Sequence, residues 1–183
     1  MSLCIVANWK LNGSREFNQQ WALEFLKHFN GNNFSPIGIA PASLYIDHLK
    51  EILDDHGIKI GAQNIDVLET GARTGEISAF MINDLGCEFS IIGHSERRIL
   101  FDETSQIIRQ KLIQANNNSV IPILCIGESA EENQANNTFN VLKKQINEAL
   151  KDIAELSSLI IAYEPVWAIG SGKIPNPEEI NSV

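Results

Sequence analysis

The chain has 183 residues, of which 44% are hydrophobic and 20% are charged, and its formal net charge is −9. This composition is typical of a globular protein, and the length allows one sizeable core, so we expect residues 1–183 to form a single domain. The excess of negative charge argues against nucleic acid and anionic membranes as partners. No apolar run is long enough to cross a bilayer.

The cysteines and histidines are not spaced like metal ligands. The three cysteines are odd in number, lack a CxxC spacing and lie in or beside apolar runs: Cys4, Cys87 and Cys125. They are typical of structural thiols in a reducing compartment. The four histidines form no metal-like cluster in the sequence. We therefore expect a cytoplasmic protein without a metal site.

Short apolar runs alternate with amphipathic segments along the chain. The continuous apolar runs predict strands that are buried on both faces, as in parallel sheets, at residues 3–7, 37–40, 58–63, 89–92, 120–126 and 159–163. Helices are expected after Ser14, near residues 43–56, 78–85 and 104–115, around 142–153, and from 177. The aromatic residues 17, 21, 25 and 29 recur every four positions, which predicts a core-facing helix stripe rather than a cofactor pocket.

Alternating strands and helices predict an α/β fold, built either as a (β/α)8 barrel or as a doubly wound sheet. The first strand-to-helix turn, residues 8–13, reads NWKLNG. It lacks the GxGxxG pattern of dinucleotide-binding folds, and the chain has no phosphate-binding lysine motif of the Walker type. These absences favour the barrel.

In a βα barrel, functional side chains lie where each strand ends. The polar residues at the predicted strand ends are Asn8, Lys10, Gln63, Asn64, His94, Ser95, Glu96, Arg97, Arg98, Glu128 and Glu164. A carboxylate, an imidazole, an amine and an amide together can move a proton next to a carbonyl, because a base removes the carbon-bound proton while electrophiles stabilise the enediolate. Each of these signals is weak alone, and their combination is much stronger.

Five segments carry a specific resemblance. They are ANWKLNG at 7–13, GAQN at 61–64, IGHSERR at 92–98, CIGE at 125–128 and AYEPVWAIG at 162–170. In this order and spacing the chain resembles the triosephosphate isomerase family over its whole length. The resemblance implies a TIM barrel, of which these residues cover about the first six β/α units, and a place in glycolysis and gluconeogenesis without a cofactor.

The resemblance also implies roles for individual residues. Glu164 would be the base and His94 the electrophile, while Asn8, Trp9, Lys10 and Gly170 would bind the triose phosphate. Ser95, Glu96 and Trp167 would support them. A helix that begins just after His94 would place positive dipole near the imidazole, and this family is itself the standard example of a neutral histidine electrophile.

Three features depart from the family pattern. Ser171 replaces a threonine in the segment that forms the family's lid, and Ile174 with Pro175 replaces small residues where that lid ends. Pro175 restricts the backbone there. The last two β/α units of the family, which help to bind phosphate, are absent from these 183 residues, so we expect the 183-residue chain itself to be poorly active.

Two other interpretations stay open. Another phosphate-binding barrel enzyme, such as an aldolase, would need a Schiff-base lysine inside a strand, and we expect none of the strands to hold one. The chain could also be a non-catalytic barrel fragment that acts in binding or assembly.

The long segment from Asn64 to Gly75 predicts an intersubunit contact. It is long for a connection between a strand and a helix, and its family counterpart reaches into a neighbouring subunit. We expect a homodimer in which Thr74 lies near the first strand-to-helix loop of the partner.

Overall fold

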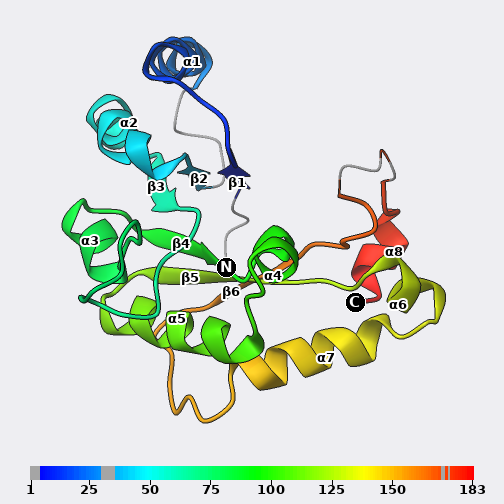
Figure 1. The fold of residues 1–183 in the computed structure, drawn as a ribbon. Coiled ribbons are helices and arrows are strands. Elements are labelled where there is room, and N and C mark those ends of the chain that lie inside the picture. Colours follow the sequence, from blue (N-terminus) through cyan, green and yellow to red (C-terminus); the bar gives the residue numbers. More distant parts are fainter. Residues whose placement is uncertain (1–4, 30–35, 170–171, 173) are drawn as a thin grey trace.

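The computed structural model describes residues 5–29, 36–169, 172 and 174–183 (Figure 1). Within these ranges six strands form one parallel sheet in chain order: β1 (Ile5–Asn8), β2 (Ile37–Ala40), β3 (Lys59–Ala62), β4 (Phe89–Ile92), β5 (Ile121–Ile126) and β6 (Ile160–Tyr163). Each strand pairs in parallel with its neighbours along the chain. The predicted α/β class and the incomplete TIM barrel are confirmed.

The helices connect successive strands and lie mainly along the outer side of the curved sheet (Figure 1). Their bounds are α1 (Arg15–His28), α2 (Ile46–Leu53), α3 (Ala79–Asp84), α4 (Ser95–Leu100), α5 (Ser105–Asn117), α6 (Ala130–Gln134), α7 (Thr138–Ala149) and α8 (Pro177–Asn181). The helix expected over residues 43–56 is divided, because 3₁₀ turns η1 (Ser43–Tyr45) and η2 (Asp54–His56) flank α2.

Local signals in the sequence fix several helix ends. The Ser14 side chain accepts a hydrogen bond from the Phe17 backbone N–H at 3.1 Å, which confirms Ser14 as an N-cap. Gly57 adopts a left-handed φ of 71° where η2 ends, as a C-terminal glycine does. The short helix α6 was not predicted, although Ser129 and Glu132 form a complete capping box at its start.

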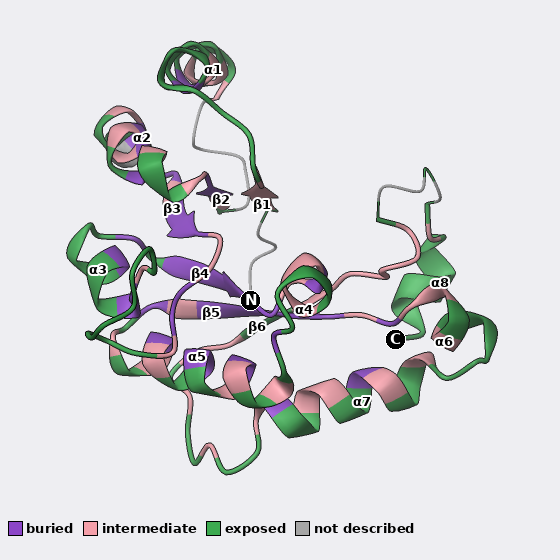
Figure 2. Ribbon diagram, viewed as in Figure 1, coloured by how far each residue is buried: buried purple, intermediate pink, exposed green. Residues whose placement is uncertain are grey.

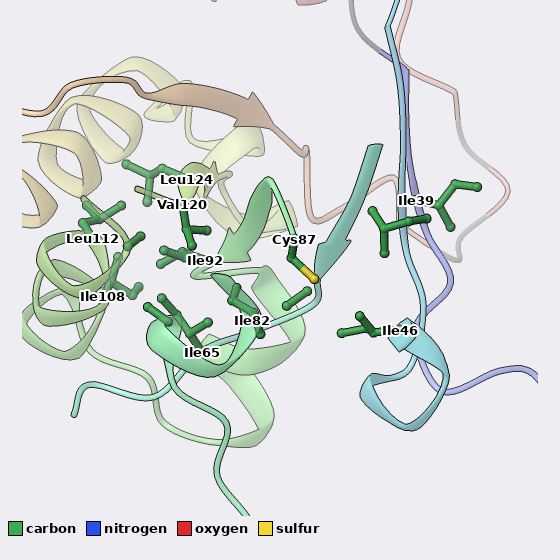
Figure 3. Packing of buried hydrophobic residues seen from close by; sticks show 14 of the residues in the cluster. Ile39, Ile46, Ile65, Ile82, Cys87, Ile92, Ile108, Leu112, Val120 and Leu124 are labelled. Carbon is green, nitrogen blue, oxygen red and sulfur yellow. The ribbon is translucent and has the colours of Figure 1, made fainter. Parts of the chain in front are cut away.

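Apolar side chains form two clusters, one on each face of the sheet. The larger lies between the strands and the outer helices, and Figure 3 shows part of it around Ile82, Ile92 and Leu112. The smaller contains Phe89, Ile91 and Cys125 on the inner face. Figure 2 shows the purple, buried residues concentrated along β3, β4 and β5.

The Phe89 ring shows why two strands carry glycine. A Cβ atom at Gly38 would lie 2.8 Å from the ring of Phe89, and one at Gly61 would lie 2.5 Å from it. These glycines therefore leave room for one large side chain inside the curve of the sheet.

The described sheet has two open edges. In the described part of the chain β1 pairs only with β2, and β6 pairs only with β5. Ile5 on β1 is 55% exposed, and Ile161 on β6 is 47% exposed. The edges thus present unpaired backbone groups together with apolar side chains.

One expectation about lysine is wrong, because Lys59 is the first residue of β3. Its ammonium group forms an ion pair with Glu88 and its side chain is 45% exposed. It lies at the amino end of the strand, opposite to the end where a barrel enzyme performs chemistry, so it does not support a Schiff-base mechanism.

Asn18 on α1 offers a test of the packing. Its side chain is fully buried, and neither its amide nitrogen nor its amide oxygen has a hydrogen-bond partner. Leucine branches at the same carbon and removes two unpaired polar atoms. We expect Asn18→Leu to raise the free energy of unfolding by about 1 kcal/mol in urea titrations. Gln19→Leu, at the exposed neighbouring position, should change the free energy of unfolding little. A loss of stability in Asn18→Leu would show that the buried amide of Asn18 is not an unpaired, destabilising group.

Candidate active site

The carboxyl ends of β1, β4 and β6 bring together the acid–base residues that the sequence predicted. Lys10 follows β1, His94 follows β4 and Glu164 follows β6. His94 contacts Glu164, and Lys10 contacts Glu96 next to His94. Residues separated by up to 154 positions in the sequence therefore form one polar cluster, as expected for parallel strands that end at a common edge.

The hydrogen bonds of His94 define its tautomer. The Glu96 backbone N–H donates to Nδ1 of His94 at 3.2 Å, because His94 is the N-cap of α4. A nitrogen that accepts a hydrogen bond carries no proton, so in the neutral ring the proton lies on Nε2. Nε2 is 3.1 Å from Oε2 of Glu164 and can donate to it. The imidazole thus presents one N–H to the site.

Glu164 is held through both its backbone and its carboxylate. Its backbone N–H donates to the Ile126 carbonyl at 2.8 Å, and its Oε1 accepts the Ser95 backbone N–H at 2.8 Å. Gly127 permits this approach, since a Cβ there would lie 1.9 Å from the Glu164 carbonyl oxygen. With its side chain 16% exposed, Glu164 is positioned by three strands of the sheet and by α4.

The thiol of Cys125 lies beside this carboxylate. Burial raises the pKa of Cys125 well above its usual value, and the charge and hydrogen bond of Glu164 raise it further. The thiol therefore stays protonated at neutral pH and acts as a neutral neighbour of Glu164. This agrees with its prediction as a structural cysteine, whereas Cys4 lies outside the described residues.

Lys10 has an unusual backbone conformation that two amide side chains support. Its φ is +54°, a left-handed value that is costly for a residue with a side chain. Asn8 Oδ1 accepts the Lys10 backbone N–H at 3.0 Å. Gln63 Nε2 donates to the Lys10 carbonyl at 2.9 Å and to the Ala40 carbonyl at 3.0 Å. The ends of β1, β2 and β3 are thereby tied around Lys10.

The Lys10 ammonium group donates to Oε1 of Glu96 at 2.8 Å. This hydrogen bond, followed by the charge of Lys10, lowers the pKa of Glu96. The two side chains are 38% and 44% exposed, and an ion pair this open contributes only about 0–1 kcal/mol. An anion can therefore compete for Lys10 at small cost.

Trp167 is fixed at a second centre, the buried carboxylate of Glu128. Trp167 Nε1 donates to Glu128 at 2.9 Å, and the Tyr163 hydroxyl donates to both of its oxygens at 3.1 Å. Burial, with the charge of Glu128, raises the pKa of Tyr163 to about 12, so this hydroxyl keeps its proton. Glu128 was recognised in the sequence only as a strand-end residue, and its role as an anchor of this segment was missed.

The other predicted site residues are distributed as follows. Ser95 is buried, and its backbone contacts Glu164. The Trp9 indole packs edge-on against Trp21, with ring centroids 4.9 Å apart, and lies against the larger apolar cluster. Gly170 and Ser171 lie outside the described residues. Arg98 and Gln63 contact the backbone of the site, although the sequence analysis assigned neither a specific role.

The described residues contain neither a candidate metal site nor a helix that could span a membrane. In that part of the chain, no group of three or more histidine, cysteine, aspartate or glutamate side chains is placed to hold a metal ion. Similarly, none of the helices found there has the length and apolarity that crossing a membrane requires.

The fold and the position of this cluster place the chain among the proteins built on the βα barrel. A family model described as "Triosephosphate isomerase" matches residues 3–183. Proteins named triosephosphate isomerase from Nitrosococcus oceani and Enterobacter cloacae are 40% and 42% identical to the chain. These alignments cover 98% of this chain and 72% and 71% of the two relatives. The chain belongs to the triosephosphate isomerase family, which confirms the resemblance seen in its sequence.

Proposed function

We propose that this protein interconverts dihydroxyacetone phosphate and D-glyceraldehyde 3-phosphate through an enediolate. The observation that carries the proposal is the contact between Nε2 of His94 and Oε2 of Glu164, 3.1 Å apart at the carboxyl end of the sheet. This contact pairs a carboxylate, which can accept a proton, with an imidazole, which can donate a hydrogen bond. The identity of the substrate is inferred from the names of the relatives, which are triosephosphate isomerases.

In the proposed reaction, Glu164 takes a proton from the carbon next to the carbonyl, and the electrons of that C–H bond form the carbon–carbon double bond of the enediolate. The oxygen that gains negative charge accepts the N–H of His94. The substrate's hydroxyl proton must also pass to this oxygen, and His94 Nε2 can give one proton and take the other. The C=O bond then re-forms at the carbon that lost its proton, while Glu164 returns that proton to the former carbonyl carbon. No other reactant is needed, because the aldose and the ketose have the same composition.

The hydrogen bonds of Glu164 suggest how substrate prepares the base. Both carboxylate oxygens have donors, Ser95 N–H and His94 Nε2. A substrate carbonyl oxygen that takes the N–H of His94 releases Oε2 of Glu164. The released oxygen is then free to approach the carbon acid, so binding and activation of the base are coupled.

Lys10 provides the test of anion binding, because the protein carries a net charge of −9 and needs a local positive group. We expect Lys10→Met to weaken the binding of 2-phosphoglycolate by about 10- to 100-fold, the loss of a hydrogen bond to a charged group. Calorimetric titration measures this. Lys144→Met, on the exposed face of α7, is the control. Equal affinities of the two variants would show that Lys10 does not bind the anion.

We also propose a homodimer formed through residues 64–75. An ion pair between Arg73 and Asp66, 2.7 Å long, stiffens this loop. Leu11 on the first strand-to-helix loop and Leu44 on η1 are 98% and 86% exposed, which a subunit contact would explain.

A cytoplasmic location and a part in glycolysis and gluconeogenesis belong to the proposal of isomerase activity.

For the dimer, we expect Thr74→Arg to lower the mass measured by sedimentation from that of a dimer to that of a monomer at micromolar concentration. A charged side chain placed in a subunit contact has no partner there and is costly to bury. Gln106→Arg on α5, away from the loop, should leave the mass unchanged. A dimer that survives Thr74→Arg argues for association elsewhere, for example through the open sheet edges.

A further inference from the structure

The pairing of β4 with β5 stops at Ile92, two residues before His94. The register runs from Phe89 opposite Ile121 to Ile92 opposite Leu124. Continued by one step, it would set Gly93 opposite Cys125. Gly93 instead turns to a φ of +70°, which is outside strand geometry. The ladder is therefore interrupted at the level that carries the acid–base pair.

The side chain of Arg98, from α4, occupies this interruption. Its Nε donates to the Gly93 carbonyl at 2.7 Å, and one of its terminal nitrogens donates to the Cys125 carbonyl at 3.0 Å. One planar guanidinium thus joins the two residues that the ladder would have paired. A Cβ at Gly93 would lie 3.1 Å from that terminal nitrogen and 2.8 Å from Ile108, so glycine makes room for the contact.

Both proposed catalytic groups are attached next to these two carbonyls. His94 follows Gly93 directly, and the Glu164 backbone N–H bonds to Ile126, the residue after Cys125. The distance between the imidazole and the carboxylate therefore depends on how β4 and β5 are spaced at this level. We propose that Arg98 is a positioning residue whose guanidinium replaces the missing rung of the ladder and sets the geometry of His94 relative to Glu164.

The chemistry of arginine suits this position. Its fork holds two acceptors at a fixed spacing, whereas a lysine ammonium is a single compact donor group. Burial lowers the pKa of Arg98, and the charge of Glu164 acts in the opposite direction. The guanidinium stays a cation, because arginine keeps its proton in proteins.

This inference deepens the proposed function, and its first test does not need turnover. Two-dimensional ¹H–¹⁵N spectra of the imidazole groups, with His94→Gln to assign His94, report which ring nitrogen carries the proton. In the 183-residue chain we expect separate Nδ1 and Nε2 signals of the Nε2–H tautomer. Arg98→Met and Arg98→Lys should move these signals towards an exchange-averaged position. The control, Arg109→Met on α5, should leave them unchanged.

Chemical rescue separates positioning from a general effect on the fold. In Arg98→Ala, millimolar guanidinium should restore the His94 signals, whereas sodium chloride at equal ionic strength should not. In any form with measurable isomerase activity, Arg98→Lys should lower kcat by about 10²-fold at nearly constant KM, the effect of a displacement of about 1 Å in the reacting groups.

The possible outcomes separate failure of the positioning role of Arg98 from failure of the proposed function. Unchanged His94 signals in a folded Arg98→Met, judged by circular dichroism, would overturn the inference. If Arg98→Met does not fold, Arg98→Lys decides, and wild-type His94 signals in that variant overturn it equally. Absence of isomerase activity in every form would count against the proposed function, while altered and guanidinium-restored His94 signals would still support the positioning role.

Discussion

Glu164→Asp is expected to lower kcat by about 10²-fold or more and to leave KM almost unchanged. Aspartate keeps the carboxylate but withdraws it by one methylene from the carbon acid, and proton transfer requires close approach. In the structure the Glu164 carboxylate spans from Ser95 N–H to His94 Nε2. The shorter side chain cannot reach both donors from the same backbone position.

The measurement is steady-state isomerisation of glyceraldehyde 3-phosphate, in the most active form of the protein available. Glu155→Asp, an exposed glutamate before β6, is the matched control and should keep both constants. A rise in KM with kcat preserved would show that Glu164 binds substrate but is not the base.

The second large effect concerns the 183-residue chain compared with a version extended by about two β/α units. We expect the shorter chain to have a kcat/KM lower by about 10²- to 10³-fold. Barrel enzymes commonly bind phosphate with the loops after strands seven and eight, and loss of hydrogen-bond donors that act in the transition state has effects of this size. Lys10 would then hold the phosphate without that backbone support.

The open edges predict a second difference between the two forms. The exposed apolar residues Ile5, Ile160 and Ile161 lie on β1 and β6, and such edges favour association of chains. We therefore expect the shorter chain to form larger species in size-exclusion chromatography with light scattering. For the kinetic comparison, similar kcat/KM values of the 183-residue chain and the extended version, measured on mass-verified samples, would show that the six described strands already build the working site.

Much of the fold could be predicted because its signals are local. The apolar runs locate β2 and β4 at their observed residues, and Ser14 marks the start of α1. The strand-end principle then places His94 and Glu164 at one edge of the sheet. These inferences need only periodicity and the direction of parallel strands.

What could not be predicted depends on contacts between distant segments. The left-handed conformation of Lys10 is supported by Gln63, 53 residues away. The sequence around Trp9 gives no sign that its indole packs against Trp21. Likewise, the role of Glu128 emerges only from its contacts with Tyr163 and Trp167, which lie 35 and 39 residues further along the chain. Such contacts are set by tertiary packing and not by a local pattern.

The chain-order arrangement of the strands has a consequence for biosynthesis. Each strand pairs with the one made just before it, so every unit can dock on its predecessor as it leaves the ribosome. At about 5–20 residues per second, translation from β1 to β6 takes on the order of ten seconds. Throughout that time the outer edge of β1 has no partner strand among the described residues. The nascent protein is therefore most exposed to unwanted pairing at its oldest strand, where a chaperone would be of greatest use.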